Sequence, residues 1–261
     1  MYFKPIQFTM EISLKNQRIL VTGASRGIGR AIAEQLSSSG AEVLIHFNTN
    51  LEQAEQVQKT LSGPSHLVPC DLSNLELVKG WIPELVKTYG KIDAVVNNAG
   101  IAVSIPDTAK TDAWTGAWLK TMDVNINALA IICKEFIEHA RQNQNGRIIN
   151  ISSRAAFRGD TPDYFAYAAS KGAIVSYTRS IARYYGKEGI KAFIIAPGFT
   201  RTDMAQDFMD QYGEEYALND IALTELTEPK DISPMVTLLC SGMADHATGT
   251  TIDINAGSYV H

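Results

Sequence analysis

Tyr167 and Lys171 are the residues whose types and spacing most directly indicate chemistry. Residues four positions apart on a helix lie one turn apart on the same face. A phenol has an ordinary pKa of about 10 and exchanges protons poorly at neutral pH, but a neighbouring ammonium stabilises the phenolate. Ser152 and Ser153 precede Tyr167 closely enough for a serine hydroxyl to reach it. The pattern predicts proton transfer at a substrate oxygen; the alternative is a solvated Tyr and Lys on an amphipathic helix.

Three glycines, Gly23, Gly27 and Gly29, follow a short apolar run at 19–21 and precede a helical pattern. Glycines let the backbone turn tightly and let phosphate oxygens approach, and the first turn of a helix offers unpaired N–H groups. The segment predicts a dinucleotide-phosphate site, although glycine turns also close βα units for structural reasons alone. The predicted cofactor contacts in this loop are Gly23, Ser25, Arg26, Gly27, Ile28 and Gly29.

Strand-like apolar runs alternate with helical patterns along the whole chain. We predict strands at 18–22, 41–47, 66–69, 92–96, 147–152, 190–196 and 251–254, and helices at 27–39, 50–62, 73–89, 111–143 in two pieces, 163–186 and 229–241. Strict alternation requires right-handed crossovers and a parallel sheet covered on both faces. The sequence therefore predicts a single-domain α/β fold over 12–261, a Rossmann-type doubly wound sheet of seven parallel strands flanked by helices on both faces, after an N-terminal extension at 1–11.

Polar segments follow four of the predicted strands, where doubly wound sheets bind their ligands. These segments are Asp71-Leu72-Ser73, Asn97-Asn98-Ala99-Gly100, Ser152-Ser153 and Pro197-Gly198-Phe199-Thr200-Arg201-Thr202. A further candidate, Asn125, lies in an apolar stretch, where a buried amide must find hydrogen bonds. Asn125 either belongs to the functional site or only forms hydrogen bonds to a neighbouring helix.

The bulk properties exclude several classes of protein. The 261 residues carry a formal net charge of −5 and no block of Lys and Arg, so nucleic-acid binding has no electrostatic support. No apolar run approaches the ~20 residues that cross a bilayer, so no membrane partner is expected. The three cysteines lie far apart, and no histidine shares a ligand spacing, so we predict reduced thiols, a cytoplasmic location and no metal.

Taken together, the motifs resemble those of the short-chain dehydrogenase/reductase family. They occur in the family's order over about residues 12 to 259: Thr22-Gly23-x-x-x-Gly27-x-Gly29, Asn97-Asn98-Ala99-Gly100, Asn125, Ser153, Tyr167-x-x-x-Lys171 and Pro197-Gly198-x-x-x-Thr202. The resemblance implies that Tyr167 is the general acid or base and that Ser153 bonds the substrate oxygen. It implies that Lys171 lowers the Tyr167 pKa and holds the nicotinamide ribose, and that Asn125 fixes a water that relays protons.

The same resemblance implies the remaining cofactor contacts. Asn98, Ala99 and Gly100 would pack beside the adenosine, and Asp71 and Leu72 would contact adenine. The nicotinamide end would be held by Tyr167, Lys171, Pro197, Gly198, Thr200 and Thr202.

The end of the second strand favours NADP(H) over NAD(H). An NAD site normally has a carboxylate there for the ribose 2′-hydroxyl, whereas this chain has Phe47. Arg26 can meet a 2′-phosphate bidentately, helped by Asn48 or Thr49. The alternative for Arg26 is a solvated loop arginine.

The segment 248–259 looks like that of 3-oxoacyl-[acyl-carrier-protein] reductases. Those enzymes dock an acidic carrier through basic residues, and the matching positions here are Gln144 and Glu188, with Arg141, Arg183 and Lys187 as nearby basic positions. The predicted function is NADPH-dependent reduction of a ketone or 3-oxoacyl thioester. The alternatives are an NAD(P)-dependent dehydrogenase of sugars or other secondary alcohols and a catalytically silent nucleotide-binding protein.

Two further expectations concern the surface. Residues 203–225 are predicted to form a substrate lid. The apolar faces of 122–143 and 163–186 resemble those that pair across a two-fold axis, which implies a homodimer or homotetramer, although both faces could instead cover their own sheet.

Overall fold

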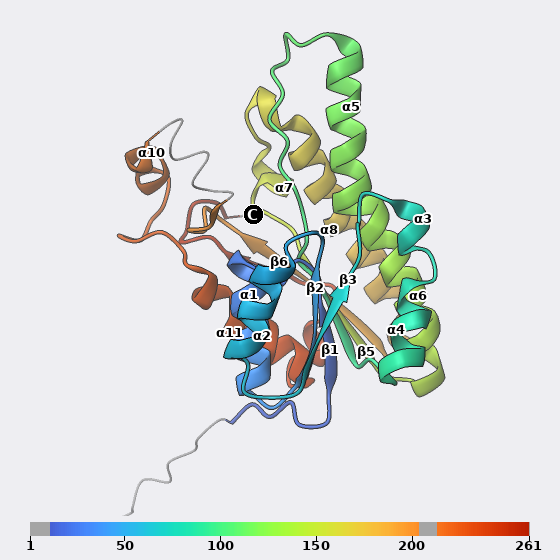
Figure 1. Ribbon diagram of the computed structural model, residues 1–261. Coiled ribbons are helices and arrows are strands. Elements are labelled where there is room, and N and C mark those ends of the chain that lie inside the picture. The colour runs from blue at the N-terminus through green and yellow to red at the C-terminus, as the bar shows by residue number, and fades with distance from the viewer. Residues whose placement is uncertain (1–10, 204–212, 261) are drawn as a thin grey trace, which may run out of the picture.

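The computed structural model describes residues 11–203 and 213–260, and within them seven strands form one parallel sheet in the order β3-β2-β1-β4-β5-β6-β7 (Figure 1). The strands are β1 (Arg18–Val21), β2 (Glu42–Phe47), β3 (Ser65–Pro69), β4 (Ala94–Asn97), β5 (Gly146–Ile151), β6 (Ile190–Pro197) and β7 (Thr251–Ile254). All pair in parallel. This confirms the predicted doubly wound sheet; the predicted extension at 1–11 lies almost wholly outside the described residues.

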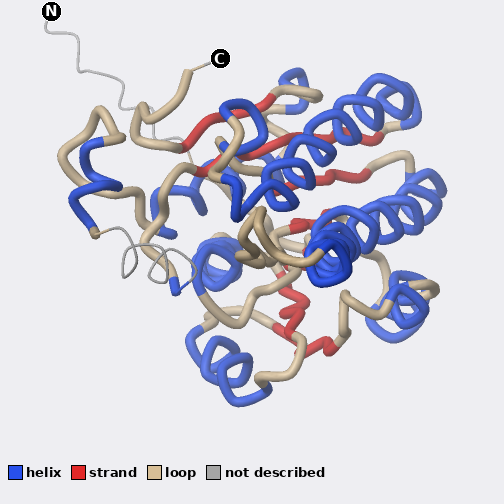
Figure 2. Tube along the Cα trace, turned by 90° about the horizontal axis from the view of Figure 1, so that it is seen from above, coloured by secondary structure: helices blue, strands red, loops and turns tan. Residues whose placement is uncertain are grey.

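Helices cover both faces of the sheet, which is why its strands are apolar on both sides (Figure 2). Leu20 points into one core with side chains of α4, α6 and α8, and its neighbours Ile19 and Val21 point into a second core with α1, α2 and α11. The helices are α1 (Gly27–Ser38), α2 (Leu51–Thr60), α3 (Leu75–Val78), α4 (Trp81–Tyr89), α5 (Thr111–Met122), α6 (Ala128–Asn143), α7 (Ala155–Arg158), α8 (Phe165–Tyr185), α10 (Glu214–Asn219) and α11 (Pro229–Ser241).

The helix predicted over 73–89 is wrong as a single element. It divides into α3 and α4 because Gly80 adopts a left-handed conformation with φ of 81°. The Gly80 N–H donates to the Glu135 carboxylate of α6 at 2.6 Å, which fixes the break. Two short helices, α7 and α10, were not predicted at all.

The segment predicted as two helices over 111–143 contains a π-helical turn, Asp123–Asn127, between α5 and α6. π-turns are rare and occur frequently at functional sites. Asn125 lies within this turn and is fully buried.

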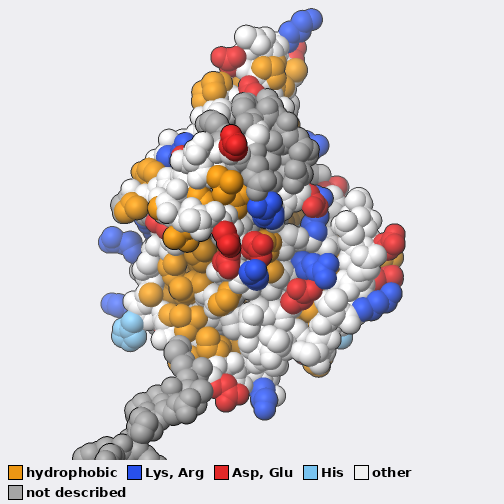
Figure 3. All heavy atoms as spheres, turned by 90° about the vertical axis from the view of Figure 1, so that its left-hand side faces the viewer, with side chains coloured by type: hydrophobic (Ala, Val, Ile, Leu, Met, Phe, Trp, Pro, Cys, Tyr) orange, Lys and Arg blue, Asp and Glu red, His pale blue; other side chains and the backbone are white. Residues whose placement is uncertain are grey.

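The carboxyl ends of the strands meet at one edge of the sheet, and α10 lies beyond that edge (Figure 1). The predicted lid at 203–225 is described only in part, since 204–212 lie outside the described residues. On the face shown in Figure 3, acidic and basic side chains are intermixed. No helix within the described residues is long and apolar enough to span a membrane.

Candidate active site

A cleft of about 1040 Å³ lies at the carboxyl edge of the sheet, where the strand order reverses between β1 and β4. This is the position at which doubly wound sheets bind dinucleotides. Of the 20 predicted site residues, 18 line this cleft, and Gly29 and Asn125 do not. The lining residues are Gly23, Ser25, Arg26, Gly27, Ile28, Asn48, Asp71, Leu72, Asn98, Ala99, Gly100, Ser153, Tyr167, Lys171, Pro197, Gly198, Thr200 and Thr202.

The glycine loop is held by the end of β4. Thr22 Oγ1 accepts from the N–H groups of Asn98 and Ala99 at 2.9 and 3.0 Å. The Asn98 side-chain amide donates to the carbonyls of Thr22 and Gly23 at 2.9 and 3.1 Å. Asn98 therefore shapes the turn in addition to lining the cleft. A Cβ at Gly23 would lie 3.0 Å from Ala99 Cα, so the turn leaves no room for a side chain there.

His46, at the end of β2, is a functional residue that the sequence reasoning missed. Its Nδ1 accepts from the Gly23 N–H at 2.9 Å, and its Nε2 lies 2.9 Å from the Cys70 carbonyl. Burial lowers the His46 pKa to about 4, so the ring is neutral, with Nε2–H donating and Nδ1 accepting. The imidazole ring thus links the glycine turn to the residue that follows β3. Only the burial of this histidine in a strand could be read from the sequence.

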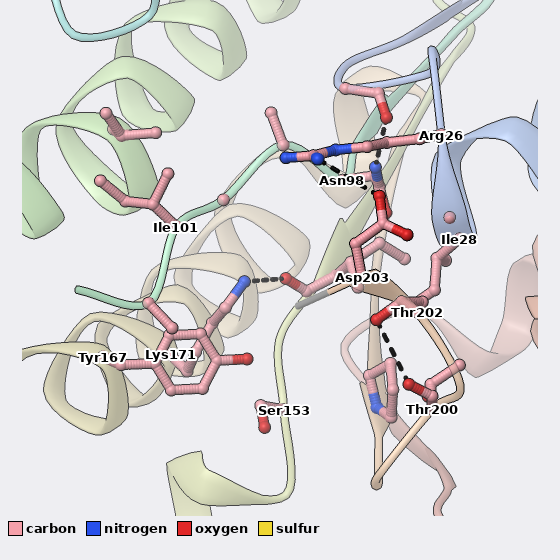
Figure 4. Close-up of a pocket in the computed structure, with 18 of the residues that line it drawn as sticks. Arg26, Ile28, Asn98, Ile101, Ser153, Tyr167, Lys171, Thr200, Thr202 and Asp203 are labelled. Carbon is pink, nitrogen blue, oxygen red and sulfur yellow. Dashed lines mark hydrogen bonds and ion pairs between the residues drawn. The ribbon is translucent and has the colours of Figure 1, made fainter. Parts of the chain in front are cut away.

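The two serines after β5 have different roles. Ser152 Oγ donates to the Lys171 carbonyl at 2.9 Å and so holds helix α8 against the strand. Ser153 lies in the cleft beside Tyr167 (Figure 4), and its Oγ accepts from the Ala155 N–H at 3.1 Å. Of the two serines, Ser153 therefore has its hydroxyl beside Tyr167 in the cleft, and its bond to a substrate oxygen stays a prediction.

The role predicted for Lys171 at Tyr167 stays a prediction, because burial dominates the pKa of Tyr167 in this structure. Burial raises the pKa of Tyr167, and the side chain of Ser153 opposes that shift. Lys171 Nζ lies 5.6 Å from the Tyr167 ring centroid and donates to the Ile151 carbonyl at 3.0 Å. Burial also lowers the Lys171 pKa to about 8. Lys171 and Tyr167 are therefore both buried, and burial disfavours the charged form of each side chain.

Asn125 lies behind the cleft and connects three elements. Its amide donates to the Ile101 carbonyl at 2.9 Å and to Ser170 Oγ at 3.0 Å, and its Oδ1 accepts from the Ile101 N–H at 2.8 Å. A Cβ at Gly100 would lie 3.3 Å from both Asn125 Oδ1 and Lys171 Nζ. Glycine at position 100 therefore leaves Asn125 and Lys171 undisturbed, because a larger residue would press on both side chains.

Arg26 precedes α1 and is mostly exposed at the cleft mouth. Its Nη1 lies 3.3 Å from Asp203 Oδ2, with side chains 67% and 72% exposed (Figure 4). At the adjacent strand end, Asp71 accepts from Ser73 N and Oγ at 2.9 and 2.7 Å, which lowers the pKa of this carboxyl. Exposed ion pairs contribute little to stability, so Arg26 can exchange partners readily.

Two arginines near Ser153 were also missed by the sequence reasoning. Arg154 and Arg158 line the cleft, and both donate through Nη1 to Asp220 Oδ2, just after α10. The Arg154 guanidinium lies 4.4 Å from the centroid of the Phe199 ring. In the sequence these residues read as ordinary surface charges, because Asp220 is 62 positions or more away.

The fold and the cleft together define an oxidoreductase that uses a nicotinamide dinucleotide. A glycine turn before the first helix, at the switch point of a doubly wound sheet, is a dinucleotide site. The Ser153, Tyr167 and Lys171 side chains lie at the same cleft.

The comparisons with known proteins identify the family. A family model described as enoyl-(acyl carrier protein) reductase matches residues 23–259. The 3-oxoacyl-[acyl-carrier-protein] reductase FabG of Haemophilus influenzae is 34% identical over 241 residues, covering 92% of this chain and 97% of the relative. The chain belongs to the short-chain dehydrogenase/reductase family and is an NAD(P)-dependent oxidoreductase acting on CH–OH groups.

Solved structures agree with this assignment. A putative NAD(P)-dependent gluconate 5-dehydrogenase from Beutenbergia cavernae, with bound NADP, has a TM-score of 0.87 at 30% identity and covers 95% of this chain and 99% of its own. A 3-oxoacyl (acyl-carrier-protein) reductase from Agrobacterium tumefaciens with NADP bound has a TM-score of 0.87 at 25% identity, covering 98% and 100%.

Proposed function

We propose that this protein reduces a ketone or a 3-oxoacyl group to a secondary alcohol with NADPH, with Tyr167 as the proton donor. The observation that supports this most is that Ser153, Tyr167 and Lys171 line the same cleft as the glycine loop. The residues present fit a dinucleotide, because Gly23 and Gly27 line the cleft and the glycine turn leads into the first turn of α1.

When bound, NADPH supplies the hydride that the carbonyl carbon accepts. The chain supplies orientation and the proton. Ser153 Oγ bonds the carbonyl oxygen, and the Tyr167 O–H transfers its proton to that oxygen as the C–O double bond is reduced. The Lys171 ammonium stabilises the phenolate that remains until solvent returns the proton.

The experiment that tests this function follows NADPH absorbance with a panel of ketones, 3-oxoacyl thioesters and sugars. NADPH oxidation by carbonyl compounds supports a reductase. Activity only with NADP⁺ and a sugar or other secondary alcohol supports the second candidate, a dehydrogenase, which the likeness to the gluconate 5-dehydrogenase favours. Binding of NADPH without turnover of any compound would favour a silent nucleotide-binding protein.

A preference for NADP(H) is part of this proposal. β2 ends at Phe47, so no carboxylate stands there to repel a 2′-phosphate, and Arg26 at the cleft mouth offers a cation. Asn48 and Thr49 line the same region and add polar contacts.

Replacing Arg26 with Ala is expected to raise the KM for NADPH by about 10- to 100-fold, because charge-assisted hydrogen bonds contribute about 1.5–3 kcal/mol. The KM for NADH should change little, since NADH lacks the 2′-phosphate. Arg30→Ala is the matched control, because Arg30 lies one turn further along α1 and pairs with Glu34 at 2.9 Å. Equal effects of Arg26→Ala on both cofactors would contradict the proposed preference.

The kcat/KM for ketone reduction is expected to fall as the pH rises through about 8, where buried Lys171 loses its proton. The raised pKa of Tyr167 keeps the phenol protonated in this range, so the proton donor persists while its stabilising charge disappears. A Lys171→Gln variant should be slower, with a pH profile that is level through pH 8. A wild-type profile that stays level well above pH 8 would contradict this assignment.

A carrier-linked substrate receives less support from the charges around β5. Glu188 pairs with Arg141 at 2.5 Å, which neutralises the nearest basic position to Gln144. We therefore favour a small carbonyl substrate over one bound to acyl carrier protein.

The assembly state and location remain part of the proposal. Ile174 and Ile181 of α8 are buried against this molecule's own sheet, whereas Tyr184 is 75% exposed. We keep a homodimer or homotetramer and a cytoplasmic location as predictions, and sedimentation of the purified protein tests the former.

A further inference from the structure

Two cations beside the reacting position share one carboxylate. Arg154 directly follows Ser153, and Arg158 follows one helical turn later, at the end of α7. Arg154 Nη1 donates to Asp220 Oδ2, and Arg158 Nη1 donates to the same oxygen at 2.7 Å. Asp220 comes from the segment after α10, so this carboxylate reaches the pair from a different part of the chain.

The pair lies in the cleft rather than on an outer surface. The Arg154 side chain is only 10% exposed and packs over Phe199, and Arg154, Arg158 and Phe199 all line the cavity that Tyr167 lines. A guanidinium this deeply buried is costly unless an anion meets it. A second carboxylate near both arginines, that of Asp160, belongs to a residue that also lines the cleft.

We infer that Arg154 and Arg158 bind a carboxylate of the substrate, and that the Asp220 carboxylate takes that place in the structure. Guanidinium groups match the planar geometry of a carboxylate, and two that converge on one oxygen form a ready site for it. The inference rests on the proposed function and narrows its substrate to an oxo acid. The carboxylate would lie beside Ser153 and thereby direct the carbonyl of the same molecule toward Tyr167.

The position of the pair argues against a purely structural clamp. An ion pair that only fastened the 213–228 segment could lie anywhere along it, and apolar side chains would serve with less desolvation. Here the buried cation is the immediate neighbour of the serine that meets the substrate oxygen. The ion pair between Arg141 and Glu188, near the positions where related reductases dock the carrier protein, independently disfavours a carrier-bound thioester. Such a thioester would have no free carboxylate.

The first test measures the ratio of kcat/KM for an oxo acid to that for its methyl ester, using acetoacetate and 4-oxopentanoate. Arg158→Gln should lower this ratio at least tenfold, with Arg158→Lys in between. Asp220→Asn should raise the ratio, because it removes the competing carboxylate. Arg183→Gln, an exposed arginine on α8, is the matched control and should leave the ratio unchanged.

Opposite effects of Arg158→Gln and Asp220→Asn are the signature of the inference. A structural clamp predicts that both substitutions damage the enzyme in the same direction and leave the acid-to-ester ratio unchanged, which would overturn it. Reduction of esters and acids with equal efficiency in the wild type would also overturn it, while leaving the proposed carbonyl reduction standing.

A binding measurement keeps the inference testable without turnover. Calorimetric titration of the NADPH-loaded protein with butanoate should show binding that is at least tenfold tighter than that of butanamide and is weakened at least tenfold in Arg158→Gln. Equal binding of the acid and the amide would overturn the inference. The absence of carbonyl reduction with every compound, despite butanoate binding, would instead overturn the proposed function alone.

Discussion

Replacing Tyr167 with Phe is expected to lower kcat for ketone reduction by about 10²- to 10⁴-fold, the range that a positioned general acid contributes. The substitution removes one oxygen and keeps the ring, so the packing of α8 should persist. The carbonyl oxygen would then have to take its proton from water while Ser153 alone bonds it. Steady-state NADPH oxidation measures the loss, and fluorescence titration should show that the Kd for NADPH changes far less than kcat.

Tyr177→Phe is the matched control for this experiment. Tyr177 lies on the same helix, and its hydroxyl donates to the Ala130 carbonyl at 3.2 Å, away from the cleft. Its loss should cost about 1 kcal/mol of stability and leave kcat within twofold of wild type. If Tyr167→Phe retained most of the wild-type rate, the proton would come from another group and the proposed mechanism would be wrong.

The sheet could be predicted because its strands are buried on both faces. Such strands appear in the sequence as continuous apolar runs, and β6 shows this clearly, since all of its side chains except Lys191 are buried. Alternation of these runs with helical patterns then leaves the doubly wound arrangement as the simplest solution.

The break between α3 and α4 could not be predicted in this way. The residues at 73–89 are compatible with one helix, and a lone glycine in a helical pattern is tolerated. What separates the two helices is Glu135, whose carboxylate accepts from the N–H groups of Gly80 and Ile82 at 2.6 and 3.2 Å. Glu135 is more than fifty positions away in the sequence, so a tertiary contact determines where the helix breaks.

The site was predictable to the extent that its chemistry is local. Tyr167 and Lys171 can be recognised as candidate catalytic residues from their residue types and their spacing. His46, Arg154 and Asp220 cannot be identified in this way, because contacts with distant parts of the chain place them: a backbone N–H 23 positions away for the histidine and a carboxylate 66 positions away for the arginine. The direction of the Tyr167 pKa shift could not be predicted from the sequence either, since the burial that causes it depends on the whole fold.

Replacing Gly29 with Ala is expected to weaken NADPH binding at least a hundredfold and to destabilise the protein by about 3 kcal/mol, the upper end for overpacking. A Cβ at this position would lie 2.2 Å from the Gly23 carbonyl oxygen and 2.5 Å from Asn98 Nδ2. The first atom belongs to the glycine turn and the second to the Asn98 side chain that holds this turn, so helix α1 would have to move away from both. The N–H groups of its first turn would then no longer face the phosphates.

Gly116→Ala provides the contrast that isolates this effect. Gly116 lies within α5, and a Cβ there would meet nothing within 4 Å, so alanine should stabilise the helix by about 0.5–1 kcal/mol. Urea unfolding gives the free energy of unfolding of each variant, and titration with NADPH gives its Kd. A Gly29→Ala protein that bound NADPH as tightly as the wild type would show that the start of α1 does not need to touch the glycine turn, and the cofactor assignment of this cleft would lose its physical basis.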